Sequence, residues 1–298
     1  MNQLILGDNL ATLRYLNSES VDLIYLDPPF FSNRNYEVVW GDKGEVRSFE
    51  DRFSGGIEHY IMWLKERVQE MYRVLKPTGS LFLHCDWHAS HYIKVYVLDK
   101  IFGYENFRGE ITWQRTNAHN DAKKKLAVLK DSIFYYTKNG EYSYKPIYLE
   151  LSEDYKTNFY RNEDERGVYM SGDLTGPKIN PKDPEWHGYH PKKSGRSWAV
   201  PNVLIESIAG KEAVKTLSTF EKLELLYDNG YIIFTGNGTP RVKRYLEYSK
   251  GILLGDVWTD IKNISAQSKE LIGYPTQKPE KLLERIIQMA SNESDVVL

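Results

Sequence analysis

The sequence predicts an α/β protein, and three observations lead to this prediction. Short apolar runs alternate with stretches of helical periodicity through residues 1–100 of the 298-residue chain. Pro77-Thr78-Gly79 provides a turn between a long helical stretch and the apolar run that follows it. No internal repeat or low-complexity tract is visible, so a repeat architecture is not expected.

The expected elements of the first part follow in chain order. Leu4-Ile5-Leu6 predicts a short strand, the leucine spacing from Asn9 to Leu16 predicts a helix, and the apolar run from Val21 to Leu26 predicts a second strand. These are followed by a long amphipathic helix over 57–75, a strand over 80–85, a helix over 89–101, and two aromatic and β-branched strands over 110–114 and 132–137 that are suited to pair.

Residues 140–260 have a different composition, rich in Tyr, Trp, Pro, Gly and Lys, with few periodic segments apart from a helix near 211–227. This shift indicates a second, inserted module. Regular structure is expected to return at Pro279, which suits the first helical position. The inward-facing residues expected on that helix are Leu282, Leu283, Ile286 and Ile287, and residues 295–298 are expected to start a strand.

The composition is that of a soluble globular protein, with 41% hydrophobic and 27% charged residues. Cys85 is the single cysteine, which excludes an intramolecular disulfide and fits a reducing cytoplasm. The N-terminus lacks the features of a signal peptide, and no run approaches the roughly 18 apolar residues of a membrane span. A cytoplasmic protein without a membrane segment is therefore expected.

The net charge of −2 does not fit a small basic DNA-binding module. The charge is unevenly distributed, because basic residues outnumber acidic ones over 108–145 and 178–215, whereas acidic residues dominate 150–170. Polyanion binding would therefore be local, on a face built from the middle of the chain. An ordinary solvated surface is the alternative interpretation.

The tetrapeptide Asp27-Pro28-Pro29-Phe30 directly follows the strand expected over 21–26. Ligand sites of open α/β sheets lie at the carboxyl ends of strands. The two prolines fix the backbone and leave carbonyl oxygens as acceptors without N–H donors. The Asp27 carboxylate and the Pro28 carbonyl can each accept a hydrogen from an exocyclic amine while Phe30 stacks on its ring. A simple proline turn after a strand is the alternative.

Such an arrangement suits methylation of a base amine. The amino nitrogen of adenine or cytosine is conjugated with its ring, so it is a poor nucleophile until two acceptors localise its lone pair. Proton-acceptor assistance contributes about 10²–10⁴-fold, and holding amine and methyl donor in line contributes roughly 7–11 kcal/mol. A base inside a duplex cannot reach such a pocket, so it would have to flip out.

The tetrapeptide resembles the catalytic motif of the β-class S-adenosylmethionine-dependent amino-group DNA methyltransferases, the N6-adenine and N4-cytosine enzymes. Further matching stretches run in one order over almost the whole chain: Gly7-Asp8-Asn9-Leu10, residues 31–36, Arg73 to Ser80, His84-Cys85-Asp86-Trp87, Glu110 to Arg115, and Tyr274 to Pro279.

This resemblance implies a Rossmann-like methyltransferase sheet with an inserted target-recognition region. Residues 1–139 would form the catalytic part, 140–270 the insert, and 271–298 the return to the methyltransferase domain. In the family a glycine-rich loop follows the last of these strands and holds the cofactor, whereas this chain ends at Leu298. The sheet is therefore expected to be incomplete at its C-terminus, and residues 1–298 alone are expected to bind S-adenosylmethionine weakly.

The resemblance also implies roles for individual residues. The catalytic residues would be Asp27, Pro28, Pro29 and Phe30. The cofactor-binding residues would be Asp8, Asn9, Gln277, Lys278 and Pro279, although Asp8 would also serve as a helix N-cap and Pro279 as a helix start. The DNA-binding residues would be Arg34, Asn35, Tyr36, Arg115, Lys123, Lys124, Lys125 and Arg196.

Three clusters have competing interpretations. The aromatic and cationic group Trp186, His187, Tyr189, Arg196 and Trp198 suits either base contacts or a small core. His84, Cys85, Asp86, His88 and His91 are crowded together, but without a second ligand pair a strand end beside the pocket is favoured over a metal site. Gly236-Asn237-Gly238 is favoured as a turn over a nucleotide loop.

The expected function is site-specific methylation of double-stranded DNA with S-adenosylmethionine as cofactor. Adenine N6 is favoured because Asp-led tetrapeptides resemble the adenine enzymes, and cytosine N4 is the alternative. An RNA or protein amine methyltransferase and a catalytically silent DNA-binding fragment remain further alternatives. A cognate restriction subunit and a polypeptide that supplies the cofactor loop are the further candidate partners.

Overall fold

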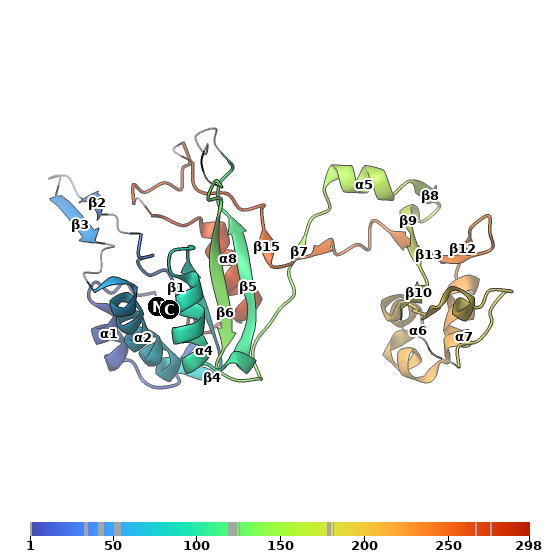
Figure 1. Cartoon of the computed structure of the whole chain (residues 1–298). Helices are drawn as coiled ribbons and strands as arrows, with labels where there is room; N and C mark the ends of the chain where they lie inside the picture. The colour runs from blue at the N-terminus through green and yellow to red at the C-terminus, as the bar shows by residue number, and fades with distance from the viewer. Residues whose placement is uncertain are drawn as a thin grey trace. The chain divides into compact units, whose positions relative to one another are not determined.

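The computed structural model describes the chain except residues 1, 33–34, 41–44, 51–54, 119–123, 125, 178–179, 181, 266 and 275, with the backbone alone for 35–40 and 45–50. The chain forms two compact units (Figure 1). The first unit combines Met1–Ile147 with Leu253–Leu298, and the second is Tyr148–Ile252.

The first unit contains both helices and strands. Its helices are α1 (Asn9–Tyr15), α2 (Gly56–Val74), α3 (Ser90–Tyr92), the π-helix η1 (Ile93–Leu98), α4 (Asp99–Ile101), the 3-10 turn η2 (Tyr104–Asn106) and α8 (Glu280–Ala290). Its strands are β1 (Val21–Leu26), β2 (Asn35–Trp40), β3 (Glu45–Glu50), β4 (Leu75–Cys85), β5 (Phe107–Gln114), β6 (Lys130–Thr137) and β15 (Val257–Trp258).

A five-stranded mixed sheet in the order β1-β4-β6-β5-β15 organises this unit. β1 and β4 are parallel, with Leu23 opposite Ser80 and Leu26 opposite Leu83. Parallel neighbours need a long crossover connection, and α2 lies within the one that joins β1 to β4. β6 is antiparallel to both β4 and β5. The predicted α/β class is confirmed, and so is the pairing of the strands predicted over 110–114 and 132–137.

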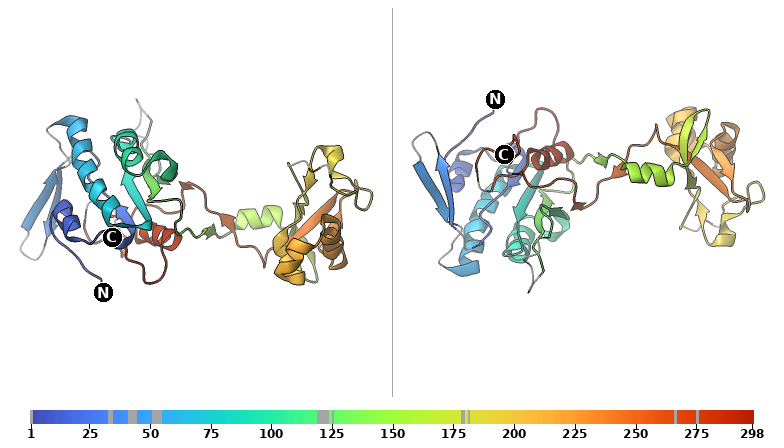
Figure 2. Two further views of the ribbon diagram at one scale, coloured as in Figure 1. Left: turned by 90° about the horizontal axis from the view of Figure 1, so that it is seen from below. Right: turned by 90° about the horizontal axis from the view of Figure 1, so that it is seen from above.

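Both faces of this sheet are covered by helices, which Figure 2 shows from two sides. Side chains alternate between the faces along each strand. On β4, Leu81 and Leu83 pack into the core cluster beneath α2, whereas Phe82 packs into the cluster beneath α8. Because both faces are buried, the central strands consist of nearly continuous apolar runs rather than an alternating pattern.

The last residues of the chain add a short parallel pairing beside β1, as the sequence predicts for 295–298. Val297 forms an isolated parallel bridge with Leu23. The amide of Leu23 donates to the Val296 carbonyl at 3.2 Å, and the Leu298 amide donates to the Leu23 carbonyl at 2.9 Å. β1 is therefore hydrogen-bonded on both of its sides.

Two expectations for the first unit are wrong. Leu4-Ile5-Leu6 forms no strand, and Leu4 is 99% exposed. An apolar run becomes a strand only where a neighbouring strand supplies hydrogen bonds, and within the described residues no strand pairs with it. Ile287 is 41% exposed rather than inward-facing, because the buried stripe of α8 runs through Leu282 and Ile286 to Met289.

The second unit is built on a smaller antiparallel sheet in the order β12-β13-β9-β8. Its helices are α5 (Glu153–Phe159), the 3-10 helix η3 (Pro191–Ser194), α6 (Asn202–Thr216) and α7 (Thr219–Asp228). Its strands are β7 (Tyr148–Leu149), β8 (Asn162–Asp164), β9 (Gly167–Asp173), β10 (Thr175–Gly176), β11 (Ser197–Trp198), β12 (Ile232–Phe234), β13 (Pro240–Tyr245) and β14 (Ile252–Leu253), of which β14 reaches into the first unit.

Gly236-Asn237-Gly238 is a turn, as predicted. It joins the antiparallel strands β12 and β13, and the amide of Gly238 donates to the Thr235 carbonyl at 2.8 Å. Gly238 has a φ of 73°, a left-handed conformation that glycine adopts without a steric penalty.

The compact second unit is narrower than the insert expected over 140–270. Residues 253–270 belong to the first unit, where β15 pairs in parallel with β5. Trp258 is 1% exposed, and the Trp113 indole donates to the Ile261 carbonyl at 2.8 Å. Residues 253–270 are placed in the first unit by their packing against the main sheet. Composition alone does not reveal this packing. Among the described residues no helix has the length and apolarity to cross a membrane.

Replacing Trp258 with Ala should destabilise the first unit by roughly 3–5 kcal/mol, because the change removes a fully buried indole and leaves a cavity. Its neighbour Val257 is 59% exposed, so Val257→Ala should change stability by no more than about 0.5 kcal/mol. Hydrogen exchange resolved by mass spectrometry checks both variants. Weakened protection confined to the second unit in Trp258→Ala would contradict the assignment of this segment.

Candidate active site

The tetrapeptide Asp27-Pro28-Pro29-Phe30 lies where β1 ends, next to the end of the parallel strand β4. Pro28 is buried, Phe30 is half-buried, and the side chain of Asp27 is 28% exposed. The Tyr60 hydroxyl, from α2, donates to the Pro29 carbonyl at 2.7 Å. This bond ties the tetrapeptide to a long helix, so the carboxylate and the aromatic ring project from a fixed backbone.

Asp27 forms an ion pair with Lys278, a residue 251 positions away in the sequence. The Lys278 Nζ lies 2.7 Å from Asp27 Oδ2 and also donates to the Thr276 carbonyl at 2.9 Å. The same ammonium lies 5.3 Å from the centroid of the Phe30 ring. The structure therefore brings the Gln277-Lys278-Pro279 segment to the tetrapeptide, with an N–H donor already placed on its carboxylate.

A cavity of about 390 Å³ opens beside these groups. Its lining includes Phe30, Trp113, Arg115, Asp131, Gln277 and Lys278. Aromatic rings, carboxylates and cations thus meet around one concave space, which is the usual character of a small-molecule pocket.

Behind this cavity lies a buried hydrogen-bonded chain that sequence reasoning did not identify. The Tyr25 hydroxyl lies 2.7 Å from His84 Nδ1, and His84 Nε2 lies 3.1 Å from Asp131 Oδ2. Asp131 also forms an ion pair with Arg115, in which Oδ1 lies 2.9 Å from Nε without hydrogen-bond geometry. Burial, and then the charges of Asp27 and Asp131, hold the pKa of Tyr25 well above its usual value, so its hydroxyl keeps its proton at neutral pH.

The order of the strands explains why the sequence did not predict these side-chain hydrogen bonds. His84 stands on β4 and Asp131 on the neighbouring strand β6, where Cys85 is paired with Ser132. The family resemblance includes the stretch at His84, so the sequence drew attention to this residue. It gave no sign of Asp131, because the two residues become neighbours only through the pairing of β4 with β6.

Asp8 caps the first helix and forms an ion pair. Its carboxylate accepts from the amides of Leu10 at 3.0 Å and Ala11 at 3.1 Å, and Arg67 lies 2.7 Å from Oδ2. The Ala11 amide and then the Arg67 guanidinium hold the pKa of Asp8 below its usual value. Arg67 also donates to the side chain of Asn9 at 2.9 Å.

A second cavity, of about 260 Å³, lies beside this helix. Its lining includes Gly7, Asn9, Ile24, Leu26 and Leu298. The capping role of Asp8 is visible, and the cofactor role predicted for Asp8 and Asn9 stays a prediction.

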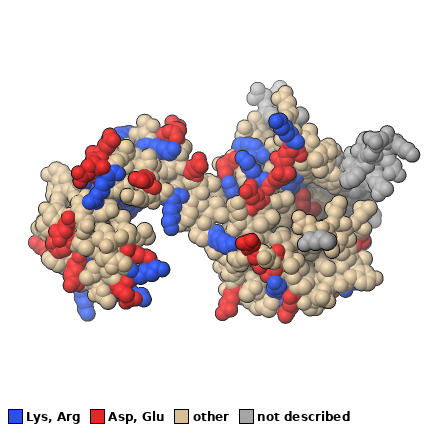
Figure 3. Space-filling model, turned by 180° about the vertical axis from the view of Figure 1, so that it is seen from behind, with Lys and Arg blue, Asp and Glu red and all other residues tan. Residues whose placement is uncertain are grey.

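Of the residues predicted to bind DNA, the structure describes the side chains of Arg115, Lys124 and Arg196. Arg34, Lys123 and Lys125 lie outside the described residues, and only the backbone of Asn35 and Tyr36, in β2, is described. Lys124 is exposed, and Arg115 lines the site cavity. In the second unit, Arg196 donates to the Thr175 hydroxyl at 2.8 Å. Figure 3 shows acidic and basic side chains interspersed over one face of the molecule.

The aromatic group of the second unit builds a small core. Trp186 is 1% exposed and packs with Leu223 and Leu226. Its indole donates to Glu224 Oε1 at 2.7 Å. No group of three His, Cys, Asp or Glu side chains in the described part of the chain is placed to hold a metal ion.

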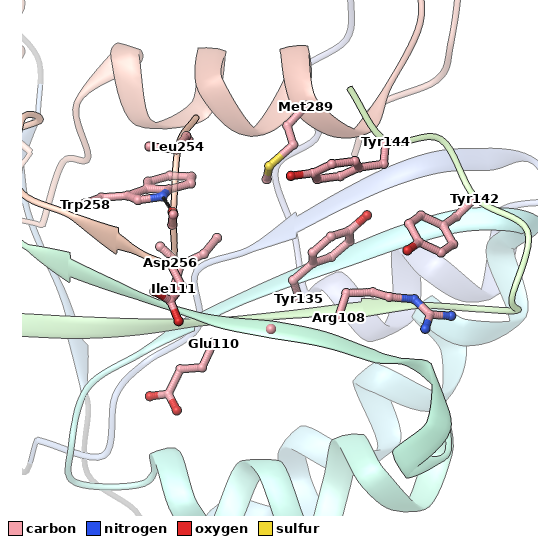
Figure 4. Close-up of a pocket in the computed structure, with 12 residues that line it drawn as sticks. Arg108, Glu110, Ile111, Tyr135, Tyr142, Tyr144, Leu254, Asp256, Trp258 and Met289 are labelled. Atoms are coloured by element: carbon pink, nitrogen blue, oxygen red, sulfur yellow. Dashed lines mark hydrogen bonds between the residues drawn. The ribbon is translucent and has the colours of Figure 1, made fainter. Parts of the chain in front are cut away.

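A third cavity, of about 280 Å³, lies against β5 and β6 beneath α8 (Figure 4). Tyr135, Tyr142, Tyr144 and Met289 gather around it, while the carboxylate of Glu110 points to the other side of its strand. Burial raises the pKa of Tyr135 to about 12, so this phenol is protonated at neutral pH.

Comparison with known proteins identifies related sequences. A family model described as DNA methylase matches residues 21–298. The chain is 26% identical over its whole length to the type II methyltransferase M.EcaI of Enterobacter cloacae, covering 61% of that protein. It is 25% identical to the Mod subunit of the type III restriction-modification enzyme StyLTI of Salmonella typhimurium, covering 47% of it, and 24% identical to the DNA adenine methyltransferase YhdJ of Escherichia coli, covering 69%.

Solved structures with partial likeness include the M1.HpyAVI–SAM complex, at 14% identity and a TM-score of 0.39, covering 100% of this chain and 81% of that one. The PvuII cytosine-N4-specific DNA methyltransferase is 16% identical with a TM-score of 0.35, covering 47% of this chain and 50% of that one. The chain spans about half to two thirds of the length of the curated relatives described above.

The Asp8 carboxylate should make stability depend on pH in the acid range. Its pKa is lower in the folded state than in the unfolded state, where it is about 4. The ionised carboxylate therefore contributes fully to the free energy of unfolding above about pH 4, and this contribution is lost as the pH falls through the folded-state pKa. Asp8→Asn keeps a capping oxygen but cannot titrate. Urea midpoints measured between roughly pH 5 and pH 2 should therefore fall less steeply in Asp8→Asn. Equal slopes in the two proteins would exclude this role.

Proposed function

The chain belongs to the DNA methylase family, and on this premise we propose that it transfers a methyl group from S-adenosylmethionine to an exocyclic base amine in double-stranded DNA, with adenine N6 as the preferred acceptor. The observation that carries the proposal is the ion pair of Asp27 with Lys278 beside the Phe30 ring, because both Lys278 and Phe30 line the 390 Å³ cavity.

The position of the Lys278 ammonium supports a base-amine site. Its Nζ presents N–H donors to Asp27 Oδ2 at 2.7 Å and lies close to the Phe30 ring. A base amine stacked on Phe30 would present the same kind of donor to the same carboxylate. The acceptor and the aromatic surface that such an amine requires are therefore both present next to Lys278, a residue that lines the cavity.

In this proposal the protein acts chiefly by positioning the acceptor amine. Asp27 Oδ1 and the Pro28 carbonyl accept the two amine hydrogens, which localises the nitrogen lone pair for attack on the methyl group. Such assistance is worth about 10²–10⁴-fold, whereas alignment of the two reactants contributes roughly 7–11 kcal/mol. The base must leave the duplex to reach a pocket at the end of β1.

S-adenosylmethionine would supply the electrophilic methyl group. The residues beside the 260 Å³ cavity fit such a ligand in character, because Ile24 and Leu26 offer apolar surface while Asn9 offers a polar group. Asp8 and Asn9 would hold it at that cavity, and Gln277, Lys278 and Pro279 would border its amino-acid end. The Gln277 amide also donates to the Glu270 carbonyl at 2.7 Å, which fixes this border segment.

Two features favour adenine over cytosine. The tetrapeptide begins with Asp, as in the adenine enzymes that it resembles, and one relative is named a DNA adenine methyltransferase. The sequence resembles the N4-cytosine enzymes of the family as well, so cytosine N4 is the second candidate.

The second unit is the proposed target-recognition region, because it is a separate compact insertion between parts of the catalytic unit. The similarity to the Mod subunits of the StyLTI and EcoP15I type III enzymes supports a cognate restriction subunit as a partner. A cytoplasmic location is proposed from the single reduced cysteine, Cys85.

Asp27→Ala should abolish methyl transfer while DNA affinity stays within a few-fold, because Asp27 acts on the amine in the transition state whereas phosphate contacts supply most of the affinity. Transfer of labelled methyl groups and DNA binding by anisotropy measure the two effects. The matched control is Asp22→Ala on the same strand, whose carboxylate binds Lys76 instead. Near-normal turnover in Asp27→Ala would remove this residue from catalysis.

Replacing Lys123, Lys124 and Lys125 with Ala should weaken DNA binding and flatten its dependence on salt, because fewer counterions are released. The slope of log affinity against log salt concentration measures this directly. The triple change Lys65→Ala, Lys100→Ala and Lys281→Ala removes equal charge from the helices α2, α4 and α8 of the first unit and provides the comparison. An unchanged slope in the first variant would make these lysines an ordinary surface.

A further inference from the structure

One buried imidazole, that of His84, contacts several walls of the site cavity. The His84 side chain is 0% exposed. Its ring centroid lies 5.2 Å from that of Phe30 and 5.5 Å from that of Trp113. Its Nδ1 lies 3.8 Å from Asp27 Oδ1. The position of the His84 ring therefore affects Phe30, Trp113 and the Asp27 carboxylate together.

The partners of His84 also determine which of its nitrogens carries the proton. Asp131 is a carboxylate and can only accept, so the Nε2 that faces it at 3.1 Å must carry hydrogen. Nδ1 of the neutral ring then has a lone pair, which can accept the hydrogen of the Tyr25 hydroxyl at 2.7 Å. The side chains of His84 and Asp131 are 0% and 4% exposed, so water does not compete for either bond.

We propose that His84 is the positioning residue of this site, and that Asp131 and Tyr25 hold it in the tautomer that leaves Asp27 Oδ1 available to the base amine. The inference rests on the proposed function and extends it to residues outside the catalytic tetrapeptide.

The reason lies in the two oxygens of Asp27. Oδ2 already accepts from Lys278, so Oδ1 is the oxygen that would receive the amine hydrogen. In the opposite tautomer, Nδ1–H would donate to the Tyr25 oxygen at 2.7 Å, and its positive end would lie near Oδ1, 3.8 Å from Nδ1, which would make that oxygen a weaker acceptor for the amine. A lone pair on Nδ1, satisfied by the Tyr25 hydroxyl, removes this positive dipole and orients the ring at the same time.

Asp131→Asn tests the tautomer while preserving the shape of the side chain. The amide can rotate to donate to Nε2, which moves the ring proton to Nδ1. In ¹⁵N NMR of the histidine ring, the wild-type protein should show Nε2–H and the variant should show Nδ1–H. The ¹³C shift of the Asp27 carboxyl should move as well. The kcat should fall by about 10-fold or more, as for a histidine held in the wrong tautomer, with DNA affinity and melting temperature nearly unchanged.

Two variants complete the test. Tyr25→Phe removes the donor to Nδ1 but keeps the Asp131 bond, so its kcat should fall less than that of Asp131→Asn. The matched control Tyr136→Phe removes a buried phenol that bonds to Asp99 instead. It should leave kcat and the ¹³C chemical shift of the Asp27 carboxyl unchanged. If Asp131→Asn does not fold, His84→Ala with added imidazole replaces it, and rescue of turnover by imidazole is expected.

The NMR readouts separate this inference from the proposed function, because they need no turnover. A wild-type protein that transfers no methyl group to DNA would overturn the proposed function. An Nδ1–H tautomer in the wild-type protein, or an Asp27 shift that does not respond to Asp131→Asn, would overturn the role of His84. Equal kcat values in the wild-type protein and Asp131→Asn would overturn it too.

Discussion

The ion pair between Asp27 and Lys278 joins the two parts of the first unit on which the proposed chemistry depends. Asp27 ends the strand β1, whereas Lys278 precedes α8 after the chain has passed through the second unit. The side chains of both residues are partly withdrawn from water, at 28% and 13% exposure, so their attraction is stronger than that of a surface pair. The second unit therefore separates Asp27 from Lys278 in the sequence, yet the two residues meet in the first unit.

The buried polar chain behind the pocket requires the mixed sheet around it. A desolvated histidine and carboxylate destabilise a fold unless their hydrogen bonds are satisfied. The antiparallel pairing of β4 and β6 places Asp131 beside His84, and the parallel pairing of β1 and β4 places Tyr25 on its other side. The sheet order that confirms the α/β class thus also holds the groups around Asp27.

Local signals allowed much of this structure to be predicted. The Asp27 tetrapeptide, the long helix α2 and the hairpin strands β5 and β6 depend on neighbours in sequence, and the structure has them where the pattern indicates. Long-range pairing accounts for the errors. Leu4-Ile5-Leu6 has the composition of a strand but no partner among the described residues, and Trp258 lies in a segment of insert-like composition but packs against the main sheet. The link from His84 to Asp131 likewise depended on strand order.

Identification of the methylated nucleoside tests the central claim most directly. The protein is incubated with S-adenosylmethionine and unmethylated double-stranded DNA, the DNA is digested to nucleosides, and the products are quantified by mass spectrometry. A pocket that presents Asp27 to a stacked amine predicts N6-methyldeoxyadenosine as the main product. Methylation confined to a ring carbon, or no methyl group on any exocyclic amine in the presence of bound cofactor, would contradict the account.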